Sequence, residues 1–350
     1  MSTEEDVIFK SIGNAGVITL NRPKALNALN VSMVDKIHPK LKEWEGQKHL
    51  IIINGTGEKA FCAGGDVRVI VESGFKGGKL GFEFFRKEYS LNGYIGRYKK
   101  PYVAIIDGIV MGGGVGLSVH GPYRIATERS VFAMPETAIG LFPDVGGSYF
   151  LPRLQGKLGT YLALTGHRLT GSDIYKAGIA THYCESQSIK ELEELLVQCS
   201  NHDDIKNVLN KFNKNDGKPF SLDSILPKIN KCFAAPTVEQ IIQELETDGS
   251  DWAKGVLNTL AKMSPTSLKV SLKIMQEGAK LPLDRCLEME YRVAVGCLTN
   301  TDFYEGVRAL LIDKDQKPKW NPSSVMDVSE TIVNSYFNKL SDDQELIHKL

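Results

Sequence analysis

Residues 102–116 read YVAIIDGIVMGGGVG, and they carry the strongest structural signal in the chain. The run Tyr102–Ile106 is continuously apolar, which is typical of a β-strand covered on both faces. A glycine-rich turn follows, and a helical pattern begins after it. Asp107 and the glycines interrupt the apolar character, which excludes a membrane-spanning helix. A strand, a glycine turn and a helix in this order indicate an α/β protein.

The same alternation runs through the first half of the chain. We expect strands at residues 7–12, 16–20, 50–53, 102–106, 124–126 and 131–133, and helices at 31–45, 82–97 and 114–121. Strands that are separated by helices imply crossover connections, and hence parallel pairing.

The second half of the chain is mostly helical in pattern. The expected helices are 188–199, 203–212, 237–246, 251–262, 265–277 and 283–297. The segment Asn213–Pro219 is the most linker-like one. We therefore predict an α/β core over residues 1–212 and a helical C-terminal region, packed on that core, over residues 213–350.

Charge and cysteine content exclude several classes of function. The 42 Lys and Arg residues balance 42 Asp and Glu residues, so the chain lacks the basic excess typical of nucleic-acid binders. The six cysteines show no C-x-x-C spacing, which argues against a zinc site and favours a reduced, intracellular protein. We expect no metal, no nucleic-acid partner and no membrane partner.

Two glycine-rich segments, FCAGGD at residues 61–66 and MGGGVG at 111–116, are candidates for binding an anion. Each precedes a helix start, where backbone N–H groups lack partners, and glycine lets a ligand oxygen approach the backbone. Two such segments side by side can direct two donors at one oxyanion. Tight packing between helix and strand also selects glycine, and this alternative stays open for either segment alone.

Two carboxylates, Glu136 and Asp144, lie in apolar loops and each follows a proline. Burial in an apolar pocket raises the pKa of a carboxyl group, which suits acid–base chemistry. The structural alternatives are a helix N-cap for Asp144 and a turn contact for Glu136.

A third carboxylate, Glu88, shares one face of its helix with Phe84, Leu91 and Ile95. A charge on an apolar face needs a partner, so Glu88 either meets a polar ligand or forms a buried salt bridge.

Several of these motifs together resemble the crotonase (enoyl-CoA hydratase/isomerase) superfamily. The matching segments are ITLNRPKALNAL at residues 18–29, AFCAGGD at 60–66 and the turn Gly112–Gly114, and the likeness covers most of residues 6–185. The resemblance implies a crotonase-type ββα spiral core and an acyl-CoA substrate, with no cofactor beyond the CoA of that substrate. It also implies an oxyanion hole made by the N–H groups of Gly65 and Gly113. Ala25, Leu26 and Ala63 fall where the family wraps the CoA.

Within the superfamily, the run FAMPETAIGLFPDVGG at residues 132–147 resembles the 3-hydroxyisobutyryl-CoA hydrolase subgroup. The implied function is hydrolysis of a small β-hydroxyacyl-CoA thioester, most simply 3-hydroxyisobutyryl-CoA in valine catabolism. Hydratases of the superfamily usually carry a glutamate at the position of Gly116 and a glycine at that of Asp144. An enoyl-CoA hydratase or isomerase is the alternative enzyme, and a non-catalytic acyl-CoA- or RNA-binding protein is the alternative from another class.

The subgroup resemblance assigns a role to each carboxylate. Glu136 either attacks the thioester carbonyl or acts as general base on water. Asp144 positions water or the substrate hydroxyl, and Glu88 lines the acyl pocket together with Gly113.

The resemblance implies the mitochondrial matrix as the compartment. The N-terminus is acidic and unlike an Arg-rich transit peptide, while the ending His348-Lys349-Leu350 differs by one residue from a peroxisomal signal. The peroxisome is therefore the alternative. Crotonase relatives often form trimers, so a homo-oligomer is an open expectation, as is the choice of acyl group.

Overall fold

The computed structural model describes residues 5–346, and the chain divides into two compact units. Unit 1 comprises Met1–Gly65, Leu91–Ala133 and Arg168–Ser221, and unit 2 comprises Asp66–Ser90, Met134–His167 and Leu222–Leu350. The division into 1–212 and 213–350 made from the sequence stays a prediction. The C-terminal tripeptide considered as a peroxisomal signal lies outside the described residues.

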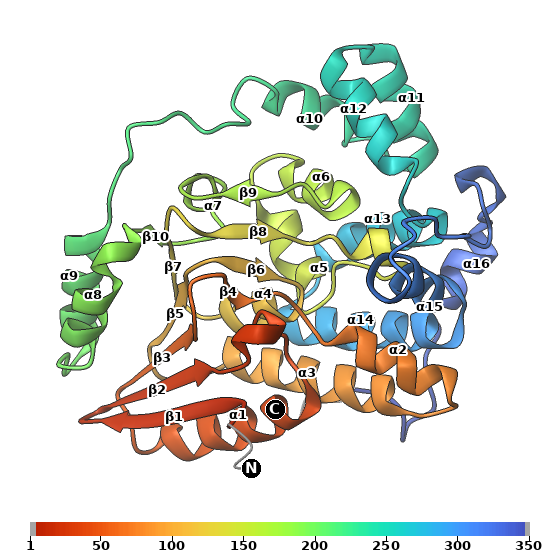
Figure 1. Cartoon of the computed structure of the whole chain (residues 1–350). Helices are drawn as coiled ribbons and strands as arrows, with labels where there is room; N and C mark the ends of the chain where they lie inside the picture. The colour runs from red at the N-terminus through yellow and green to blue at the C-terminus, as the bar shows by residue number, and fades with distance from the viewer. Residues whose placement is uncertain (1–4, 347–350) are drawn as a thin grey trace. The chain divides into compact units, whose positions relative to one another are not determined.

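Unit 1 contains a six-stranded sheet with the order β1-β2-β3-β5-β7-β10, most of which can be followed in Figure 1. Its strands are β1 (Val7–Ile12), β2 (Ala15–Leu20), β3 (Leu50–Gly55), β5 (Tyr102–Ile106), β7 (Tyr123–Ala126) and β10 (His182–Tyr183). The hairpin β1–β2 is antiparallel and all the other pairs are parallel. The parallel pairing expected from the alternation of strands and helices is confirmed.

Helices of unit 1 cover both faces of this sheet, which explains why its strands are apolar without alternation. On one face, Val17, Ile52 and Ile105 pack with residues of α8 (Ile189–Leu196) and α9 (His202–Phe212). On the other face, Trp44 of α1 (Val31–Glu45) lies directly against Gly16, where a Cβ would come within 2.3 Å of the indole ring.

A second sheet in unit 1 has the order β4-β6-β8-β9. Its strands are β4 (Ala60–Cys62), β6 (Ile109–Met111), β8 (Val131–Ala133) and β9 (Leu169–Thr170). Along the chain, β3, β5 and β7 of the first sheet are each followed by β4, β6 and β8 of the second, and helices separate these pairs. This repeat is the expected ββα spiral. Strand β4 was absent from the strands expected from the sequence, yet this short segment pairs with β6.

The remaining elements of unit 1 are short. They are the 3-10 turns η1 (Pro23–Ala25) and η4 (Ser186–Ser188) and the helices α4 (Gly113–Ser118) and α7 (Asp173–Lys176).

Unit 2 is helical, as the pattern of the second half indicated. It contains α2 (Val67–Phe75), the first part of α3 (Leu80–Gly96), η2 (Glu136–Ile139), α5 (Gly147–Phe150), η3 (Leu151–Arg153), α6 (Leu158–Thr165), α10 (Leu226–Cys232), α11 (Val238–Asp248), α12 (Asp251–Leu260), α13 (Pro265–Gly278), α14 (Leu283–Thr299), α15 (Asp302–Val307), η5 (Arg308–Ile312), η6 (Val325–Asp327) and α16 (Glu330–Ser335). Of the helices described, none combines the length and the apolar character needed to cross a membrane.

Gly114 marks the closest approach of α4 to β4, since a Cβ there would lie 2.2 Å from the carbonyl oxygen of Cys62. We predict that Gly114→Ala lowers the free energy of unfolding by about 1–3 kcal/mol, because backbone has to move. Gly255→Ala is the matched control, since nothing lies within 4 Å of its Cβ position on α12. That change should raise stability by about 0.5–1 kcal/mol. Denaturant melts measure both, and equal effects of the two would contradict the prediction.

Candidate active site

The two glycine segments of unit 1 lie side by side, as predicted. Strand β4 pairs with β6, and a Cβ on Gly64 would lie 3.5 Å from the carbonyl oxygen of Met111. Gly64 has a φ of 116° and Gly112 a φ of 43°, conformations that favour glycine. Within residues 5–346, neither the amide of Gly65 nor that of Gly113 donates a hydrogen bond to the backbone. Two amides from neighbouring loops are thus available to an oxyanion.

The three residues predicted to contact CoA are brought together in unit 1. Ala25 ends the turn η1, and Leu26 follows it with a φ of 51°. The amide of Ala63 donates a hydrogen bond of 3.0 Å to the carbonyl oxygen of Leu26. The segment that follows β2 is therefore tied directly to the first glycine loop.

Asn27 fixes this arrangement, although sequence reasoning did not single it out. Its side chain is buried and donates hydrogen bonds to the carbonyl oxygens of Thr56 and Ala60, at 3.0 and 2.8 Å. It also accepts a hydrogen bond of 2.9 Å from the amide of Arg22. One amide side chain thus holds the loop before the first glycine segment in place.

Among the buried carboxyl groups of unit 2, four interact with one another and form what we call the acidic cluster: Glu88, Glu136, Asp144 and Glu290. Glu88 lies on α3, Glu136 begins η2, Asp144 precedes α5, and Glu290 lies in the middle of α14. None of the four is more than 5% exposed. Three of them were predicted site residues, and the structure places those three close enough for their charges to interact.

Asp144 is held by the side chain next to Glu88. The hydroxyl of Tyr89 donates a hydrogen bond of 2.7 Å to Oδ2 of Asp144, and both residues are buried. Burial raises the pKa of Asp144 to about 7, although the bond from Tyr89 acts to lower it. The N-cap alternative was wrong, because Gly146 occupies that position of α5.

Glu88 and Glu136 each have one oxygen that meets no partner, namely Oε1 of Glu88 and Oε2 of Glu136. Burial raises the pKa of both well above the ordinary value, and the charge of Asp144 raises both further. Of the cations that the structure describes, none pairs with Glu88, so the salt-bridge alternative was wrong. Unsatisfied carboxyl oxygens of this kind are available to a polar substrate or to water.

Glu290 was missed from the sequence. Its Oε2 accepts a hydrogen bond of 2.7 Å from the amide of Gly146, and its Oε1 accepts bonds of 2.9 and 2.6 Å from the amide and hydroxyl of Ser148. Burial raises the pKa of Glu290 to about 8, although these three bonds oppose the shift. The available signal was a glutamate on the apolar face of the predicted helix 283–297, the same signal that identified Glu88.

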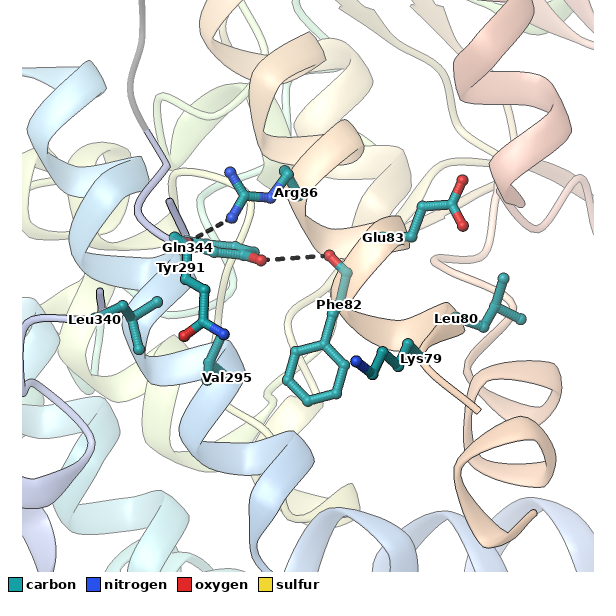
Figure 2. Close-up of a pocket in the computed structure, with 9 residues that line it drawn as sticks. All are labelled: Lys79, Leu80, Phe82, Glu83, Arg86, Tyr291, Val295, Leu340 and Gln344. Carbon is teal, nitrogen blue, oxygen red and sulfur yellow. Dashed lines mark hydrogen bonds between the residues drawn. The ribbon is translucent and has the colours of Figure 1, made fainter. Parts of the chain in front are cut away.

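A separate pocket of about 690 Å³ is bordered by α3 and α14 (Figure 2). It is lined by Lys79, Leu80, Phe82, Glu83, Arg86, Tyr291, Val295, Leu340 and Gln344. Figure 2 shows Arg86 reaching Gln344 and Tyr291 reaching Phe82 across this pocket. No member of the acidic cluster lines it, so the cluster and this pocket are distinct.

We predict that Asp144→Asn stabilises the protein above neutral pH. The pKa of Asp144 is about 7 in the native state, whereas the ordinary value, which applies to the unfolded chain, is 3.8. Between these two pH values the native state therefore binds more protons than the unfolded chain. The free energy of unfolding therefore falls as the pH rises through this window, and the neutral amide removes that loss. At pH 8 the melting temperature should rise by about 2–4 °C.

At pH 4 the two proteins should melt almost together. The exposed Asp223→Asn, outside any helix or strand, is the matched control, and it should change the melting temperature at neither pH. A lower melting temperature for Asp144→Asn at pH 8 would show that the carboxylate stabilises the fold.

Comparison with known proteins gives the same family over nearly the whole chain. The family model described as enoyl-CoA hydratase/isomerase matches residues 15–337. A Xenopus laevis protein named 3-hydroxyisobutyryl-CoA hydrolase, mitochondrial, is 56% identical over 95% of this chain and 89% of its own. Its Homo sapiens namesake is 54% identical over 96% of this chain and 89% of its own.

A solved structure confirms the fold. The carnitinyl-CoA dehydratase of Mycobacterium thermoresistibile superposes with a TM-score of 0.92 at 38% identity, over 98% of this chain and 99% of its own. The predicted α/β architecture with a helical C-terminal region is therefore confirmed. This protein belongs to the enoyl-CoA hydratase/isomerase family.

Proposed function

We propose that this protein hydrolyses 3-hydroxyisobutyryl-CoA to 3-hydroxyisobutyrate and CoA, in mitochondria and as a step of valine breakdown. Relatives more than 50% identical over almost the whole chain carry the name of this hydrolase and the word mitochondrial. The observation that carries the proposal is Asp144, a buried acid held by Tyr89 beside Glu136, at a position where hydratases usually have glycine.

The proposed reaction needs donors for the carbonyl oxygen. When water or a carboxylate adds to a thioester, the carbonyl oxygen gains a negative charge, which backbone amides stabilise. We assign this role to the amides of Gly65 and Gly113, which have no backbone partner among residues 5–346. The thiolate of CoA is a good leaving group, and CoA itself belongs to the substrate, so the proposed reaction requires no resident cofactor.

The proposed reaction also needs a group that acts at the carbonyl carbon, and we assign it to Glu136. Its free Oε2 is buried, and burial raises its pKa well above the ordinary carboxyl value, which suits a group that takes up and returns a proton. As nucleophile, Glu136 forms a mixed anhydride while the thiolate leaves, and water then cleaves the anhydride. As general base, it removes a proton from the water that attacks directly. Asp144 positions that water or the substrate hydroxyl, and Glu88 lines the acyl pocket.

The main competing activity is hydration of an enoyl-CoA, because the solved relative is named a dehydratase. We predict that the protein releases free thiol from 3-hydroxyisobutyryl-CoA and leaves the double bond of crotonyl-CoA intact. A thiol reagent and the absorbance of the conjugated enoyl thioester measure the two reactions in parallel. Loss of that absorbance without release of thiol would instead establish a hydratase.

We predict that Glu136→Gln lowers kcat for thiol release by a factor of about 10³ or more, since an amide neither attacks the carbonyl nor takes up a proton. Circular dichroism and the melting temperature should show an intact fold. Glu246→Gln, on the exposed side of α11, is the matched control and should keep full activity. Near-normal turnover by the Glu136 variant would refute the assignment.

A single turnover in ¹⁸O-water separates the two roles of Glu136. Label found in the Glu136 carboxyl group identifies the anhydride route. Label found only in the released acid favours direct attack by water.

A further inference from the structure

Glu290 lies where a carboxyl group is costly. It occupies the apolar face of α14 with an exposed fraction of 0%, next to Leu287 and Val293, which are equally buried. A buried carboxyl group destabilises the fold unless its oxygens are hydrogen-bonded. Both oxygens of Glu290 are fully used, and all three donors belong to the short segment from Gly146 to Ser148.

The turn Val145–Ser148, which contains this segment, follows Asp144 directly, and its backbone is strained at Val145. Val145 has a φ of 51° and Gly146 a φ of 84°. Left-handed geometry costs a β-branched residue free energy and persists only where the surroundings enforce it. Glu290 holds the backbone amides on both sides of Gly147, while the amide of Gly147 itself bonds the carbonyl oxygen of Asp144 at 2.7 Å. Glu290 thus fixes the turn from which the Asp144 side chain projects.

The other attachment of Asp144 lies on a different helix. Tyr89 of α3 holds the carboxyl group itself, at Oδ2. The side chain is therefore fixed at its tip by α3 and at its backbone by α14. If the second attachment is lost, Tyr89 alone does not define the position of the carboxyl group.

We propose that Glu290 is a positioning residue for Asp144, acting through the turn Val145–Ser148, and that catalysis depends on its two acceptor oxygens. This inference rests on the proposed hydrolysis, in which Asp144 handles water or the substrate hydroxyl. Glu290 itself touches no reacting atom in this proposal.

The decisive substitution is Glu290→Gln, which keeps the shape of the side chain. It replaces one acceptor oxygen by an NH₂ group, which then faces the amide of Gly146 or of Ser148 as donor against donor. We expect kcat for thiol release to fall about 10- to 50-fold, while KM changes less than threefold. Glu288→Gln on the same helix is the matched control and should leave kcat unchanged, since within residues 5–346 the ion pair of Glu288 is with the exposed Arg285.

A double-mutant cycle separates positioning from general damage to the fold. In the Asp144→Asn background, Glu290→Gln should lower the remaining kcat by less than twofold, because the residue through which it acts is already disabled. A full 10-fold loss in that background, or wild-type kinetics for the single variant, overturns the inference. If Glu290→Gln does not fold, Ser148→Ala enters the same cycle, with an expected single loss of about three- to fivefold.

Hydrogen exchange gives a readout that does not depend on activity. The amides of Gly146 and Ser148 should exchange at least 10-fold faster in Glu290→Gln than in the wild type, and as slowly as the wild type in Glu288→Gln. Unchanged exchange overturns the inference even if kcat falls. A wild-type protein that releases no thiol refutes the proposed function instead, and the exchange measurement then still decides whether Glu290 holds the turn.

Discussion

The burial of several carboxyl groups without a neutralising cation among residues 5–346 is the constraint on which the acidic cluster of unit 2 depends. Four carboxyl groups lie together in the acidic cluster, and burial raises the pKa of each. Such groups have two ways to lower the cost, either keeping a proton or accepting hydrogen bonds. Asp144 and Glu290 combine a raised pKa with accepted hydrogen bonds, from Tyr89 to Asp144 and from Gly146 and Ser148 to Glu290. Glu88 and Glu136 each retain one oxygen without a partner, which is available to the substrate or to water.

In unit 1 the polar groups without partners are backbone amides, just as in unit 2 they are carboxyl oxygens. The segments around Gly64 and Gly112 adopt conformations that other residues avoid, and they leave amides without backbone partners. Unpaired donors cost free energy when no ligand is present, as unpaired acceptors do. Asn27 and the pairing of β4 with β6 hold these loops, so the donors are fixed before any substrate arrives.

Periodicity in the sequence predicted most helices and strands, because buried strands and amphipathic helices have distinct patterns. For example, the helix expected at residues 31–45 is α1, with the same bounds. Periodicity failed at the short strands β4, β6, β9 and β10, since a strand of two or three residues is defined by its distant partner and not by its own residues. Motifs predicted the glycine loops, Glu88, Glu136 and Asp144. Sequence reasoning missed three residues of the site: Tyr89, Asn27 and Glu290. The role of each follows from its hydrogen-bond partner, which the sequence pattern does not reveal.

The helices α3 and α14 each contribute one residue to the acidic cluster and others to the pocket of Figure 2. Glu88 and Glu290 belong to the cluster, whereas Arg86 and Tyr291 line the pocket of Figure 2. The ring of Tyr291 meets that of Tyr89 edge to face at 6.4 Å, and the guanidinium of Arg86 stacks on Tyr291 at 4.8 Å. The hydroxyl that holds Asp144 is thus braced by aromatic packing. A costly group of buried acids needs rigid neighbours, since any mobility would let water in and return the pKa values to ordinary ones.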